Sequence, residues 1–188
     1  IEPVLNQMQC KGCANKIPQS ILDRVFEENT KKGSLDANKV PNTKNIFQTT
    51  DIISSIVSDP FELGIISAKH ALNDIFASNT KPLAAQMIVS LPPAINEINK
   101  RDLIQVKSGA DYAMKKATCK IIGGHSYSNN DDQVYLGFSI IGKKKNYVKS
   151  KRIKKGNLYI TGKIGSALVF AAIEKKIING KYSEEVIN

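Results

Sequence analysis

The spacing of apolar and polar residues along the chain predicts a domain that mixes helices with strands. Residues 1–16 are interpreted as a polar arm, and helical spacing then runs from Pro18 to a stop at Lys31, Lys32 and Gly33. Polar residues 34–45 predict a loop. Segments rich in β-branched and aromatic residues predict strands over 45–57, 82–93, 119–124, 134–142 and 156–162.

Three further helices are predicted between and after these strands. Asp59, Pro60 and Glu62 form a helix start, with an N-cap acid, proline at the first position and an acid at the third, and this helix runs to about Ala77. Residues 96–117 predict a long amphipathic helix, and 166–178 a final one. The stripe of the long helix is Leu103, Val106, Ala110 and Ala113. This order predicts an α+β fold with a mixed sheet.

A basic segment near residues 143–156 predicts the domain organisation. It holds most of a dense run of lysines, which we interpret as a solvated link. We expect an arm over 1–16, an N-terminal domain over 17–148, and over 149–188 a linker with the start of a truncated C-terminal domain. The chain begins at Ile1, so we expect a piece of a longer protein.

Composition narrows the class of protein. The net charge is +10 and comes almost entirely from lysine, so a polyanion-binding role stays open as an alternative. Three cysteines show no disulfide-framework spacing, which is typical of a reducing compartment. No segment approaches the roughly 20 apolar residues that a membrane helix needs. We therefore expect a cytoplasmic protein without membrane contact.

Carboxylates occur where an apolar pattern does not favour them. Asp51 lies within a β-branched strand, Asp74 near the end of the next helix, and Asp36 in the loop before the strand. A carboxylate in apolar surroundings needs a partner, and Mg²⁺ is bound by carboxylates that leave room for water and phosphate oxygens. The alternative is a helix cap or a hydrogen-bonded polar core.

Glycines and an N-terminal thiol motif add two further candidates. Gly123 and Gly124 are predicted to follow a strand directly, where backbone N–H groups could approach a phosphate. Neither a Walker loop nor a G-x-G-x-x-G segment is present. In the arm, Cys13 lies three residues before Lys16, whose charge would lower the thiol pKa. A zinc or redox role for Cys10 and Cys13 is the alternative.

Together these segments resemble selenophosphate synthetases (selenide, water dikinases), in the superfamily of aminoimidazole ribonucleotide synthetase, thiamine monophosphate kinase and a hydrogenase maturation factor. The quoted matches are "GCANK", "TTDIISSIVSDPFELG", "ALNDIFA" and "GGHS". Departures include "LDANKV" for an Asp-Asp-Ala-Ala-Val type motif and "NTKP" for a Met-Gly-Gly type turn. Cys10 is similar to the variant fused behind a pyridine-nucleotide flavoprotein.

The resemblance implies a flexible catalytic arm over 1–16 and an ATP-binding and dimerisation domain over 17–148, and it implies roles for particular residues. Cys13 and Lys16 would be catalytic, with Lys16 also contacting the nucleotide. The metal ligands would be Asp36, Asp51 and Asp74. The nucleotide site would comprise Lys16, Thr50, Asp51, Asp74, Gly123, Gly124, His125 and Ser126. The activity implied is conversion of ATP, selenide and water into selenophosphate, AMP and phosphate by a Mg²⁺-dependent homodimer that pairs through its sheet, and we expect this fragment alone to be inactive. Another kinase or dehydratase of the superfamily, or a nucleic-acid-binding module, remains the alternative.

Overall fold

The computed structural model describes residues 17, 19–25, 37–144, 156–157, 159–162, 164–179 and 181. Its helices are α1 (Gln19–Val25), α2 (Pro60–Ala77), α3 (Asn96–Lys116) and α4 (Ser166–Glu174). Its strands are β1 (Asn38–Lys39), β2 (Ile46–Ser54), β3 (Lys81–Leu91), β4 (Lys120–Ser128) and β5 (Tyr135–Lys143). Within these ranges no helix is both long and apolar enough to cross a membrane.

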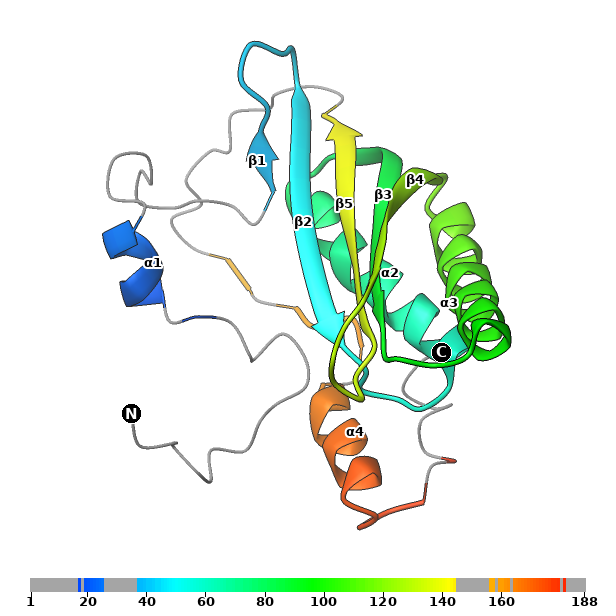
Figure 1. Ribbon diagram of the computed structural model, residues 1–188. Coiled ribbons are helices and arrows are strands. Elements are labelled where there is room, and N and C mark those ends of the chain that lie inside the picture. Colours follow the sequence, from blue (N-terminus) through cyan, green and yellow to red (C-terminus); the bar gives the residue numbers. More distant parts are fainter. Residues whose placement is uncertain are drawn as a thin grey trace.

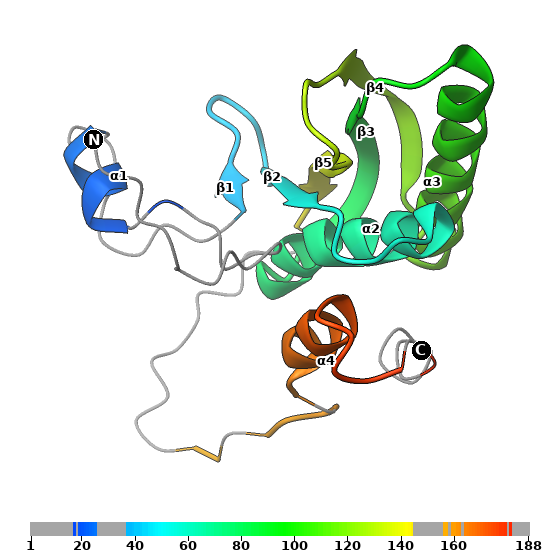
Figure 2. The same ribbon diagram turned by 60° about the horizontal axis from the view of Figure 1, so that its bottom comes forward.

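The described strands form one mixed sheet in the order β1-β2-β5-β3-β4. β3 and β4 run parallel and are joined by α3, whereas the β1–β2, β2–β5 and β5–β3 pairs are antiparallel. Both α2 and α3 lie on the same side of the sheet, as Figures 1 and 2 show from two directions. The expected α+β architecture with a mixed sheet is therefore confirmed, and none of the described helices covers the other face of the sheet.

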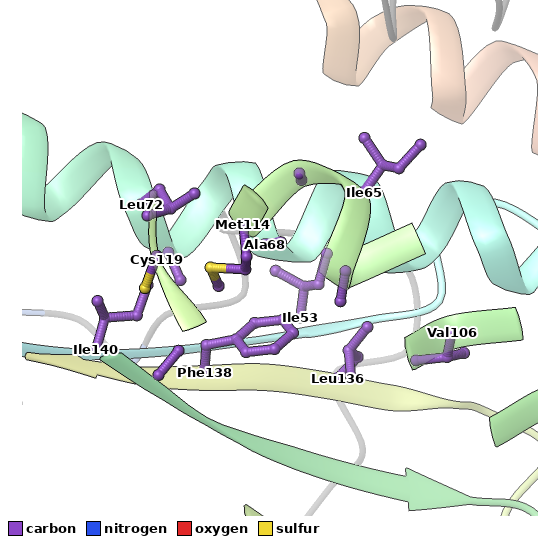
Figure 3. Packing of buried hydrophobic residues seen from close by; sticks show 14 of the residues in the cluster. Ile53, Ile65, Ala68, Leu72, Val106, Met114, Cys119, Leu136, Phe138 and Ile140 are labelled. Carbon is purple, nitrogen blue, oxygen red and sulfur yellow. The ribbon is translucent and has the colours of Figure 1, made fainter. Parts of the chain in front are cut away.

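The core fills the space between the sheet and these two helices. Phe138, on the central strand β5, lies fully buried among Ile53, Ala68 and Met114 (Figure 3). The helices themselves pack backbone to backbone: a Cβ on Gly109 would come within 1.9 Å of the Phe61 carbonyl oxygen. Only glycine permits this approach, so the α2–α3 contact is fixed by residue size.

The ends of the helices follow recognisable local chemistry. Asp59 caps α2 as predicted, because its Oδ1 accepts a 2.9 Å hydrogen bond from the Glu62 amide. Three of the described helices, α2, α3 and α4, are followed two positions beyond their last residue by a residue with positive φ that is not glycine, namely Asn79, Thr118 and Lys176. The amide of each bonds to a carbonyl three residues earlier, and the next amide bonds five residues back. This is the Schellman pattern, in which glycine is usually preferred.

Several boundaries differ from the sequence predictions. β4 does not end at the paired glycines but continues to Ser128, because β3 pairs with it along that length. The strand predicted over 156–162 is wrong for the described residues there, which form no strand and leave Tyr159 79% exposed. An isolated strand has no partner for its backbone groups. The final helix is shorter than predicted and ends at Glu174, and the predicted loop contains the short strand β1.

The predicted arm over 1–16 and most of the basic link, residues 145–155, lie outside the described residues. The division at residues 148 and 149 therefore stays a prediction. Helix α4 lies outside the sheet and the layer of α2 and α3 (Figure 2). Its Phe170 is buried, whereas Leu168 on the same helix is exposed.

Candidate functional site

Strand β2 carries polar side chains on its buried face. Phe47, Thr49, Asp51 and Ile53 alternate with exposed residues and are all buried, so they face the helix layer. Asp51 is only 9% exposed, between a threonine and an isoleucine of the same face. The sequence prediction of a carboxylate inside an apolar strand is thus matched by a buried carboxylate under α2.

Helix α2 supplies the other half of this cluster. His70 and Asp74 are four residues apart, which places them on one side of the helix. Thr49 Oγ1 donates a 3.0 Å hydrogen bond to Asp74 Oδ2, and His70 Nε2 lies 3.8 Å from Asp51 Oδ2. Asp51 and Asp74 therefore lie at the same strand–helix interface. Asp51 of the strand lies beside His70 of the helix, and Asp74 of the helix bonds to Thr49 of the strand.

Two members of this polar cluster, Thr49 and His70, were not predicted from the sequence. Both had a signal, since Thr49 is two residues from Asp51 on a strand and His70 is four residues from Asp74 on a helix. The buried Nε2 atom of His70 makes no hydrogen bond with the described residues. The polar cluster therefore comprises Thr49, Asp51, His70 and Asp74.

The donor atoms of this cluster suit a hard cation in part. In the portion of the chain that the structure describes, no three or more His, Cys, Asp or Glu side chains are arranged to hold a metal ion. Asp51 and Asp74 are two carboxylates at one strand–helix interface, and the third predicted ligand, Asp36, lies outside the described residues. Mg²⁺ is commonly held by one or two carboxylates, with water and phosphate oxygens completing its shell, so the pair fits that ion.

The predicted glycine-rich segment lies on β4, at the edge of the sheet. The register places Gly123, His125 and Tyr127 opposite Gln86, Ile88 and Ser90. Thr50 lies in the same cross-strand row as Gln86, and its Oγ1 donates to Ser139 Oγ at 3.0 Å. Thr50, Gly123 and His125 therefore face the side of the sheet without helices, while Gly124 and Ser126 face the other side.

The two neighbouring glycines have different structural requirements. A Cβ on Gly124 would lie 1.9 Å from the Met87 carbonyl oxygen, so glycine is needed there for strand packing. A Cβ on Gly123 would meet nothing within 4 Å. The packing of the described residues explains Gly124 but leaves Gly123 open to another explanation, such as the close approach of a ligand or of a second chain.

The predicted site residues that the structure describes thus fall into two groups, which lie apart from each other within one chain. Asp51 and Asp74 lie at the interface between β2 and α2, whereas Gly123 and His125 lie on the opposite face of the sheet. Strands β5 and β3 separate β2 from β4, a lateral distance of about 14 Å at the usual strand spacing. Cys10, Cys13 and Lys16 lie outside the described residues.

Cys119 takes no part in either group. It is buried in the core, and burial raises the pKa of its thiol above the ordinary value. A thiol held protonated in this way is a poor nucleophile and metal ligand at neutral pH. Its position supports a packing role.

Comparison with known proteins relates this geometry to a family. Residues 33–143, more than half of the chain, match the family described as AIR synthase related protein, N-terminal domain. The selenide, water dikinases of Escherichia coli K12 and Shigella flexneri are each 27% identical over 91% of this chain. Those alignments cover 53% of each relative, so the chain spans about half the length of the curated relatives it matches.

Solved structures share the fold at lower identity. Thiamine monophosphate kinase from Aquifex aeolicus has a TM-score of 0.52 and 16% identity, covering 66% of this chain and 41% of its own. A HypE-HypF complex has a TM-score of 0.52 and 21% identity, and the match covers 68% of this chain and 42% of the other. AaThiL complexed with AMPPCP and TMP has a TM-score of 0.54 and 15% identity, and the match covers 74% of this chain and 44% of the other. With the match over residues 33–143, the chain belongs to the AIR synthase related family, of which it contains the N-terminal domain.

Proposed function

We propose that this chain is the ATP-binding half of a selenophosphate synthetase, which forms selenophosphate, AMP and phosphate from ATP, selenide and water. The observation that carries the proposal is the alignment with selenide, water dikinases over 91% of the chain. The polar cluster supports it, because the resemblance of the sequence motifs implies that Asp51 and Asp74 bind the metal ion and the nucleotide. Both come from elements that the structure packs against each other.

Asp51 and Asp74 would hold the Mg²⁺ that accompanies ATP. When bound, this ion neutralises phosphate charge and so assists phosphoryl transfer. Thr49 fixes the orientation of Asp74 by donating to its Oδ2. His70 lies beside Asp51 at the same interface. Lys16 would stabilise charge on the transferring phosphoryl group, and Cys13 would deliver or hold selenium.

A second copy of the chain would complete the nucleotide site. The face of the sheet without described helices exposes Ile52 and Ile141, and apolar side chains on an uncovered sheet face favour association. Because Asp51 and Gly123 lie on opposite faces and three strand spacings apart, a single chain does not surround one nucleotide with both. We place ATP near the interface of a homodimer that forms through the sheet, which also covers strand edges.

Binding measurements test the proposal at the level of this chain. Calorimetric titration with ATP should show weak binding that strengthens with Mg²⁺, and Asp51→Asn should reduce affinity by about tenfold or more only when Mg²⁺ is present. Asp111→Asn is the matched control, since Asp111 is an exposed acid on α3 that pairs with Lys107. Equal effects of the two substitutions, in variants that remain folded, would contradict the role of Asp51.

Turnover tests the specific reaction. The chain alone should give little or no product, whereas the chain joined to the C-terminal half of the Escherichia coli relative should form selenophosphate, detected by phosphorus NMR under anaerobic conditions. ATP consumption with thiamine monophosphate or formylglycinamidine ribonucleotide, and none with selenide, would instead favour another member of the superfamily. The shared fold of thiamine monophosphate kinase supports that second candidate.

A further inference from the structure

Two aromatic rings lie together on the exposed edge strand. His125 and Tyr127 are two residues apart on β4, so their side chains lie on the same face of the sheet. Their ring centroids are 6.1 Å apart, with an interplanar angle of 27°. None of the described helices covers that face, and both side chains are exposed, Tyr127 by 48%. The pair therefore presents a nearly parallel aromatic surface at the edge of the sheet.

The packing of the described residues does not account for this pair. Neither ring belongs to the hydrophobic core, and the Tyr127 hydroxyl makes no hydrogen bond within the described portion of the chain. Tyr135, in the same cross-strand row, differs in this respect because its hydroxyl donates to Asp131 Oδ2 at 2.8 Å. Tyr127 thus has an aromatic body and a polar end that are both available to a ligand.

The surroundings of the pair suit a nucleotide. Gly123 lies on the same strand and the same face, and a Cβ there would meet only open space. Gln86 is its neighbour in the cross-strand row, and the hydroxyls of Ser139 and Thr50, which bond to each other, lie in the same row on the second and third strands away. An open glycine position in a polar cross-strand row is therefore followed along β4 by two exposed rings, which matches a molecule with a polar phosphate end and a flat base at the other.

We infer that Tyr127, stacked on His125, is the platform for the base of the bound nucleotide. This inference rests on the proposed ATP-binding function and adds a residue to it. Purines and pyrimidines all offer a flat π-face, so stacking on a tyrosine tolerates different bases, and removing one such ring weakens binding by about tenfold. The platform is expected to act on the base and not on the phosphates.

Separating base from phosphate tests the inference. Binding of Mg²⁺-ATP and of Mg²⁺-tripolyphosphate should be measured for the wild-type chain, Tyr127→Ala and Tyr127→Phe. We expect Tyr127→Ala to weaken ATP about tenfold and to leave tripolyphosphate unchanged, with Tyr127→Phe close to wild type. Tyr112→Ala is the matched control, because Tyr112 on α3 is 49% exposed but lies outside the sheet.

A second readout comes from the composition. The chain has six tyrosines and no tryptophan, so stacking of a base on Tyr127 should quench part of the tyrosine fluorescence in wild type and not in Tyr127→Ala. Unchanged ATP affinity in Tyr127→Ala, or an equal loss for ATP and tripolyphosphate, would overturn the inference. Absence of ATP binding in wild type would instead defeat the proposed function, and salt-sensitive binding of single-stranded oligonucleotides alone would replace both with a nucleic-acid role.

Discussion

Replacing Gly124 with alanine separates a glycine that packing requires from one that it does not. The new Cβ would lie 1.9 Å from the Met87 carbonyl oxygen and 2.7 Å from its carbon, whereas ordinary contacts begin at 3.4 Å. The obstacle is backbone, so no change of rotamer relieves it. β4 must move away from β3 by about 1.5 Å at this point, which exceeds the tolerance of a hydrogen bond between neighbouring strands.

The expected cost follows from what that movement breaks. Among the described strands, β4 lies at the edge of the sheet and pairs with β3 alone. Loss of two or three ladder hydrogen bonds, at about 1 kcal/mol each, gives a destabilisation of about 2 to 3 kcal/mol. For a chain of this size the fall in Tm would be roughly 5–10 °C. A small gain from replacing glycine in a strand, at most about 1 kcal/mol, does not offset it.

Gly123→Ala is the matched control, since it makes the same chemical change one residue away. Its Cβ enters open space, so its free energy of unfolding should be equal to that of wild type or slightly higher. Urea and thermal unfolding of both variants, followed by circular dichroism, give the comparison. Equal stability of the two variants, or a larger loss in Gly123→Ala, would refute the reasoning from Cβ distances. Weaker ATP binding by the stable Gly123→Ala variant is a separate expectation of the proposed function.

Three further outcomes are expected. Thr118→Gly should stabilise the chain by about 1 kcal/mol in urea unfolding, because Thr118 is β-branched with φ of 54°; a loss of stability would show that its side chain is needed. Thr49→Val should lower the free energy of unfolding by about 1.5 to 3 kcal/mol, since the 3.0 Å bond to the Asp74 carboxylate is lost. Thr49→Ser keeps the hydroxyl and should lose much less stability. Burial raises the pKa of the Cys119 thiol, so its contribution to stability is fully present below the unfolded pKa and is lost as pH rises through the folded pKa. Unfolding between pH 7 and about pH 10 should therefore show a smaller decline in Cys119→Ala than in wild type, and equal declines would contradict this account.

Local chemistry was sufficient to predict the helices that position the polar cluster. The α2 boundaries were correct because a cap, a proline and an acid define its start within four residues, and such interactions depend only on near neighbours. The α3 stripe was correct because helical periodicity also depends on near neighbours: Val106, Ala110 and Ala113 are buried, and Leu103 packs partly buried against the core. Asp51 was conspicuous because an acid disrupts an apolar strand wherever the strand lies.

Edge strands and termini were harder to predict. β4 after Ile121 is exposed on both faces, so the alternation that normally reveals a strand is absent, and only pairing with β3 keeps it extended. Residues 156–162 show the converse, since an apolar, β-branched segment found no neighbouring strand among the described residues. Strand formation depends on distant partners, and a sequence does not reveal these.

By itself, the sequence determined which segments become helices and which central segments become strands, and it marked Asp51 and Asp74 as carboxylates in need of partners. Only the tertiary structure decided that Thr49 and His70 are their neighbours, that Gly124 but not Gly123 is required by packing, and that the carboxylates and the β4 residues occupy opposite faces. The physical reason is range. Capping and periodicity act over a few residues, whereas the order and facing of strands are set by contacts between residues far apart in the chain.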